Sequence, residues 1–157
     1  MNCHQKFAEW KPPEIYLQNP SAVRGNFFHL CSGALVIDQL ATDRLRSILE
    51  WAGELLPLKH KGIPFYLLNV MECVNCLDNG ATEWAIGKKT GAKIRISKYG
   101  FDKRRLSEST LFKIPETAAA EVLCVSGLKD PAVEFKAQVE ANGFRGLLFE
   151  KLWSDQK

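Results

Sequence analysis

The sequence predicts an α+β fold in which two main helices pack on a largely antiparallel sheet. Two segments carry the apolar spacing or the boundary residues of helices, and several consecutive segments between them have the character of strands. The strict alternation of strand and helix that is typical of parallel sheets is absent. The length of 157 residues and the hydrophobic content of 46% fit a single domain, residues 1–157, with one core.

Two segments are expected to be helices. The first begins after Asp38, whose carboxylate can cap it, and runs to about Gly53. Its apolar side chains form one stripe, which we expect to bury against the sheet, at Ala41, Leu45, Ile48, Leu49 and Ala52. The second helix is expected to have Asp130 as its cap and Pro131 at its first position, and to end before Gly143.

Strands are predicted between and after the two helices. Residues 55–60 and 65–71 flank a turn, and the second of these is expected to be central in the sheet because it is rich in aromatic and branched side chains. Residues 82–86 and 93–99 flank a loop with glycine at both ends, which predicts a β-hairpin. The remaining predicted strands are residues 111–114, 121–125 and 146–152.

The first 33 residues are rich in residues that form loops. Proline, glycine and asparagine interrupt their short apolar pieces, so residues 1–33 are expected to form loops and one short strand. The polar residues at their start do not fit a secretion signal, and no run of about 18 apolar residues is present to span a bilayer. We therefore expect a cytoplasmic protein with no membrane contact, whose cysteines are reduced thiols.

Positive charge is concentrated in residues 87–105. This segment has a net charge of +7, whereas the whole chain carries +3 and the remainder −4. Strand alternation is expected to turn the charged residues of the hairpin to solvent and Ile94 and Ile96 inward. The basic face is either an ordinary solvated surface or a surface for a partner. The candidate contact residues on it are Lys88, Lys89, Lys93, Arg95 and Tyr99.

The four tryptophans can serve either the core or an interface. Trp51 and Trp84 fall within predicted elements and are expected to be structural. Trp10 and Trp153 lie outside the predicted elements. They are the stronger candidates for contact with a partner, because a large ring can fill a partner's pocket.

Cys73 and Cys76 form the one local pattern that suggests metal or thiol chemistry. Cysteines at this spacing can bind zinc or exchange disulfides. A structural zinc needs four ligands and no second pair follows, and a turn follows this pair in place of a helix whose dipole would activate a thiol. We expect inert cysteines, no metal and no cofactor, and keep a thiol or zinc protein centred on the pair as an alternative.

Common catalytic sequence patterns are absent. Ser32 and Ser126 lack the glycine two positions earlier that a nucleophile elbow requires. The phosphate-binding, dinucleotide-binding and zinc-protease patterns do not occur either. The sequence therefore favours a binding protein over an enzyme, and we expect no catalytic residues.

Five segments keep an order and spacing that point to one family: ALVID at 34–38, FYLLNV at 65–70, CLD at 76–78, LFKIP at 111–115 and GFRGLLF at 143–149. In these segments the chain from 34 to 153 resembles a bacterial immunity-protein family of polymorphic toxin systems, also catalogued as a domain of unknown function with myxobacterial examples. The resemblance implies a protein that neutralises a cognate toxin by forming a tight complex, with no cofactor. Residues 1–33 and Cys73 lie outside the resemblance.

The expected partner is therefore a cognate toxin protein. An RNA-binding accessory protein that uses the basic hairpin is the alternative, with Tyr99 and Phe101 available to stack on bases. Nucleic acid is the less favoured partner because an isoelectric point of about 8.6 is modest for such binders. The sequence leaves open which toxin is bound and whether the chain forms a homodimer.

Overall fold

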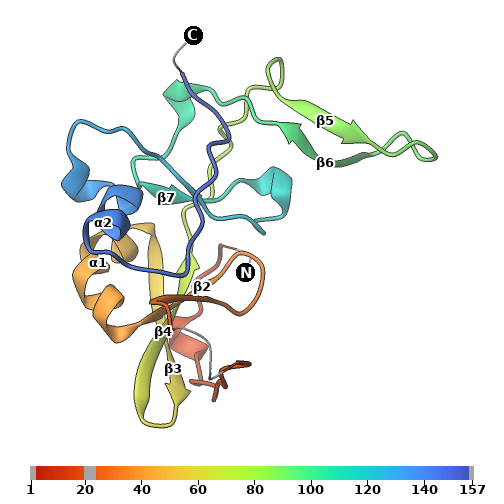
Figure 1. Ribbon diagram of the computed structural model, residues 1–157. Helices are drawn as coiled ribbons and strands as arrows, with labels where there is room; N and C mark the ends of the chain where they lie inside the picture. The colour runs from red at the N-terminus through yellow and green to blue at the C-terminus, as the bar shows by residue number, and fades with distance from the viewer. Residues whose placement is uncertain (1–2, 20–23, 156–157) are drawn as a thin grey trace.

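The computed structural model describes residues 3–19 and 24–155, and its main sheet, in the lower part of Figure 1, has four antiparallel strands. The strand order is β1-β2-β4-β3, so the predicted central strand is confirmed as β4. The turn before β4 is shorter than predicted, because Ile63 already pairs with His60. The bounds are Phe27–His29 for β1, Leu35–Asp38 for β2, Gly53–His60 for β3 and Ile63–Val70 for β4.

Asp38 joins the sheet to the first helix, α1 (Gln39–Ala52). One oxygen of its carboxylate accepts a hydrogen bond from the backbone N–H of Ala41 at 2.9 Å, and the other accepts one from Asn26 Nδ2 at 3.0 Å. The predicted cap is thus confirmed. The predicted apolar stripe of α1 is also buried, at Ala41, Leu45, Ile48, Leu49 and Ala52.

The side chains of the sheet alternate between two hydrophobic clusters on its opposite faces. Ile37 and Leu68 belong to the first cluster, which also contains the buried stripe of α1. The side chains of the second cluster come from the other face, where Trp10, Ile15 and Phe28 pack against them. The described part of residues 1–33 contains one strand, β1, as predicted, and some of its side chains cover the second cluster.

The predicted second helix is wrong in its first half. Residues Pro131–Val133 form a single 3-10 turn capped by Asp130, and the α-helix α2 covers only Phe135–Ala141. The break lies at Glu134, whose backbone is extended and whose carboxylate accepts hydrogen bonds from the N–H groups of Gly127 and Leu128 at 2.8 and 3.0 Å. The predicted end is confirmed, because Gly143 follows α2 with a positive φ of 64°.

The predicted strand at 146–152 does not form. The carbonyl of Arg145 accepts hydrogen bonds from the N–H groups of Asn26 and Phe27, and the segment then leaves β1 without a further ladder bond among the described residues. Its side chains Leu147 and Phe149, together with Phe144 just before the segment, instead pack on the first cluster.

Two other predicted strands are shorter than expected. Only Leu111–Phe112 (β7) and Leu123–Cys124 (β8) pair with each other. The pairing ends at Phe112, and the 3-10 turn Pro115–Thr117 follows soon after. No helix in the described part of the chain is long and apolar enough to cross a membrane.

Candidate functional site

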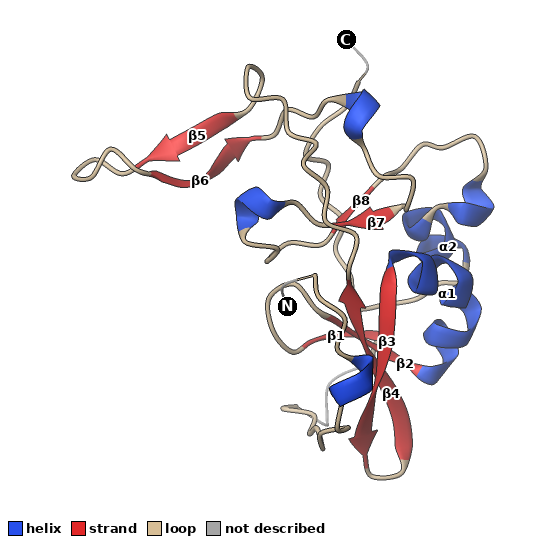
Figure 2. Ribbon diagram, turned by 180° about the vertical axis from the view of Figure 1, so that it is seen from behind, coloured by secondary structure: helices blue, strands red, loops and turns tan. Residues whose placement is uncertain are grey.

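The most prominent surface feature is a two-stranded hairpin that projects away from the rest of the molecule (Figure 2). It consists of β5 (Glu83–Ile86) and β6 (Lys93–Lys98), which confirms the predicted hairpin. The loop between the strands is closed by hydrogen bonds from Gly87 N to the Ala92 carbonyl and from Gly91 N to the Gly87 carbonyl, both of 2.8 Å. We call residues 83–98 the arm.

The base of the arm is fixed by its own small core. Ile96 is buried in a third hydrophobic cluster together with residues such as Leu77 and Phe112, and Trp84 packs against the same cluster. Beside it, the Thr82 hydroxyl donates a hydrogen bond to the Gly100 carbonyl at 3.0 Å. The base is therefore held rigidly, and the outer half extends from it.

The outer half of the arm exposes two isoleucines. Ile96 is 8% exposed, as expected, but Ile94 is 69% exposed and Ile86 is 52% exposed, so the prediction that Ile94 faces inward is wrong. The pairing explains this. Ala85 pairs with Arg95 and Ile86 pairs with Lys93, which leaves Ile94 as an extra residue at a register shift. Sequence alternation cannot reveal such a shift.

Half of the cations of residues 87–105 are held in ion pairs. Lys98 contacts Glu83 at 2.9 Å and Lys103 contacts Asp155 at 2.6 Å. Arg104 and Arg105 both contact Asp102, at 3.0 and 3.2 Å. The hydrogen bond from Arg104 is the main cause that lowers the pKa of the Asp102 carboxyl to about 2. These four cations are therefore partly neutralised by neighbours.

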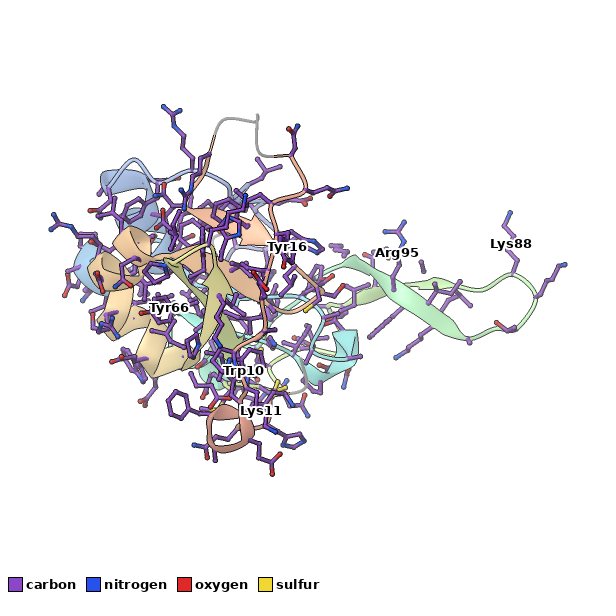
Figure 3. All side chains as sticks on the ribbon, turned by 90° about the horizontal axis from the view of Figure 1, so that it is seen from below. Trp10, Lys11, Tyr16, Tyr66, Lys88 and Arg95 are labelled. Atoms are coloured by element: carbon purple, nitrogen blue, oxygen red, sulfur yellow. The ribbon has the colours of Figure 1, made fainter. Side chains whose placement is uncertain are left out.

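The other four cations lie on the arm and have no acidic partner among the described residues. They are Lys88, Lys89, Lys93 and Arg95, all exposed and all predicted as contact residues. The Lys93 ammonium lies 4.7 Å from the centroid of the Trp84 ring, which is a cation–π contact. Figure 3 shows Lys88 and Arg95 along the projecting arm, away from the body. The structure thus gathers the predicted basic residues on one element.

The aromatic residues next to the arm are occupied within the protein. Tyr99 stacks on Phe101 with ring centroids 5.7 Å apart, and its hydroxyl donates a hydrogen bond to the Glu121 carboxylate. Burial and that carboxylate raise the pKa of Tyr99. Phe101 also meets Trp153 edge to face at 5.7 Å. The structure therefore places the predicted contact residues Tyr99 and Trp153 at the base of the arm, apart from its four cations.

The remaining three tryptophans differ in how they contact the rest of the protein. The ring of Trp10 packs on the second cluster, and its Nε1–H donates to the Pro57 carbonyl at 2.7 Å. Figure 3 places Trp10 in the body, far from the outer half of the arm. Trp84 packs on the third cluster, as expected. Trp51 is 55% exposed, so its expected structural role is wrong, because it lies beside the buried stripe of α1 and not within it.

The cysteine pair shows no sign of activation. Cys73 forms an isolated bridge with Lys113, and loss of hydration together with its contact to Cys3 raises its pKa to about 11. Cys76 is fully buried, and burial raises its pKa as well. Within residues 3–19 and 24–155 there is no group of three or more His, Cys, Asp or Glu side chains that could hold a metal.

We expect the Cys73 thiol to react slowly with iodoacetamide at pH 7, although the residue is exposed. A pKa of about 11 leaves little thiolate at pH 7. A thiolate of higher pKa is also a stronger nucleophile, which offsets part of this loss, so the rate should be about tenfold below that of the urea-unfolded chain. Mass spectrometry of the labelled peptide gives the rate, which should climb as the pH approaches 11. Equal rates in the folded and unfolded chains would contradict this prediction.

No protein-family model matches this chain, and no curated protein matches it. The resemblance drawn from the five sequence segments therefore stays a prediction.

Proposed function

We propose that this protein is a cytoplasmic immunity protein, which binds a bacterial toxin protein and neutralises it by complex formation, without catalysis. The observation that carries the proposal is the arm, a hairpin with a fixed base and an exposed outer half that bears four cations without acidic partners in the described structure. A rigid scaffold that presents a loop in this way is typical of recognition. The resemblance of the sequence to immunity proteins supplies the class of partner.

The arm is a better candidate than the cysteines for the activity of the protein. Its cations and its two isoleucines are accessible to a macromolecule, whereas the thiols of Cys73 and Cys76 have raised pKa values. Raised thiol pKa values weigh against the thiol alternative.

Shortening the arm tests the proposal. Ala85 and Arg95 are paired, so an Asn-Gly turn that replaces residues 86–94 should close the hairpin while keeping Trp84 and Ile96 at its base. The tagged full chain is purified from its native host, and a co-purifying protein is expressed alone to learn whether it stops growth. We expect the full chain to restore growth and the shortened chain to lose both the complex and the protection.

Two controls accompany the shortened chain: its thermal unfolding, and a variant changed at an exposed residue outside the arm. The shortened chain should keep the unfolding midpoint of the full chain within a few degrees, because its base is unchanged. A chain with alanine in place of Trp51, the exposed tryptophan of α1, should still protect. If the shortened arm protects as well as the full chain, the arm has no part in neutralisation. If RNA co-purifies in place of a protein, the RNA-binding alternative is favoured.

A further inference from the structure

We propose that the arm recognises an acidic protein surface that has an apolar patch between its carboxylates. Lys88, Lys89 and Arg95 would meet the carboxylates, and Ile86 and Ile94 would cover the apolar patch. This inference rests on the proposed function and specifies the chemistry of the partner.

The arm is strongly positive relative to the rest of the chain. The arm has five Lys and Arg residues against Glu83, a net charge of +4, whereas the whole chain carries +3 and the rest of the chain −1. The acidic residue of the arm, Glu83, forms an ion pair with Lys98. The outer cations therefore keep their full attraction for an external anion, and complementary charge steers such an encounter.

The exposed isoleucines distinguish a protein from other anions. Ile86 and Ile94 lie among the cations at 52% and 69% exposure, and a Cβ added at Gly87 would come within 3.3 Å of Ile94 Cδ1. Ile94 thus lies beside Gly87, the residue that directly follows Ile86. A protein partner with apolar side chains would remove both isoleucines from water, with a gain that a phosphate backbone does not offer.

The aromatic residues argue against single-stranded nucleic acid. Such ligands are held by aromatic rings on which bases stack. The rings near the arm are engaged within the protein, since Trp84 faces the Lys93 ammonium and Tyr99 stacks on Phe101. The arm therefore has cations and aliphatic side chains but no open stacking platform in the described structure.

Binding to three defined polymers tests the inference with the full chain. The probes are fluorescently labelled poly-L-glutamate, a random copolymer of glutamate and tyrosine, and polyuridylate RNA, each at low ionic strength and measured by anisotropy. We expect the copolymer to bind more tightly than poly-L-glutamate, and both more tightly than the RNA. Tighter binding of the RNA would overturn the inference.

Charge reversal locates the surface on the arm. The triple variant K88E/K89E/R95E should weaken copolymer binding by about tenfold or more, since several exposed ion pairs are lost together. A matched control reverses three exposed lysines elsewhere, K11E/K129E/K151E, and changes the net charge by the same amount. The control should weaken binding by less than twofold, and an equal loss in both variants would overturn the inference.

Replacement of the isoleucines tests the apolar part. The double variant I86S/I94S should bind poly-L-glutamate as the natural chain does but lose its preference for the copolymer. A preference that persists would remove the isoleucines from the surface. One outcome separates the two proposals. If the arm variants lose polymer binding while the shortened chain still neutralises the toxin, the proposed function of the arm is wrong and the acidic-partner inference holds. If neutralisation of the toxin requires the arm but polymer binding does not, only the acidic-partner inference is wrong.

Discussion

Replacing Gly53 with alanine is expected to lower the free energy of unfolding by about 3 kcal/mol, because the new methyl group has no room. Gly53 follows α1 directly and pairs with Val70 across the sheet. A Cβ at this position would overlap the carbonyl oxygen of Asn69 and lie 2.9 Å from the Cα of Val70. Since these are backbone atoms of the central strand, they can move only by separating β3 from β4.

The cost at Gly53 is steric, and a second glycine provides the control. The φ of Gly53 is 176°, which any residue adopts, so conformational strain plays no part. Gly62 has a φ of 76° but no atom within 4 Å of an added Cβ, and alanine there should cost only about 1 kcal/mol of backbone strain. Urea unfolding of both variants measures the difference. Equal costs would show that β3 and β4 can separate without penalty.

Replacing Phe65 with alanine is expected to cost about 3–5 kcal/mol, as for other large aromatic residues removed from a core. The ring is 1% exposed and lies at the centre of the second cluster. It meets Phe28 and His60 edge to face at 5.5 and 5.7 Å, and the Arg24 guanidinium lies 5.1 Å above it. Its loss leaves a cavity between the sheet and the residues that cover it.

The Phe65 variant should also loosen the segment that covers this face. The N–H of Ile15 donates to the Lys59 carbonyl at 2.8 Å, and hydrogen exchange of this amide should become faster than in the natural chain. Alanine in place of Phe7, which is 58% exposed, is the matched aromatic control and should change the unfolding free energy by less than about 0.5 kcal/mol. Unchanged exchange at Ile15 would mean that the cover does not depend on Phe65.

Local chemistry made much of the fold predictable. Asp38 is an efficient cap, and the stripe that follows it has the period of a helix, so α1 was predicted with its bounds. Glycines on both sides of a short polar loop predicted the arm. The α+β class followed from these elements, and the concentration of cations on the arm was visible in the charge pattern.

The missed features depend on contacts that neither periodicity nor composition reveals. Glu134 interrupts the second helix because its carboxylate binds the loop at 127–128. The segment 146–152 forms no strand, and its side chains Leu147 and Phe149 pack on the first cluster. The exposure of Ile94 comes from a register shift, which no period of two can show. The ion pair between Lys103 and Asp155 joins residues 52 positions apart, so the local charge pattern could not show that Lys103 is partly neutralised.

Both outer edges of the main sheet are covered by segments distant in sequence. Residues 13–15 cover β3, while Arg145 covers β1 and lies 119 residues after Asn26. On the ribosome, β1 therefore emerges long before the backbone that protects it. Until Arg145 has been synthesised, the nascent chain carries an open strand edge, which is the structure that pairs with neighbouring chains. Protection of this edge thus waits for residues that are synthesised much later than β1, and in that interval unfinished copies on the same polysome are exposed to aggregation.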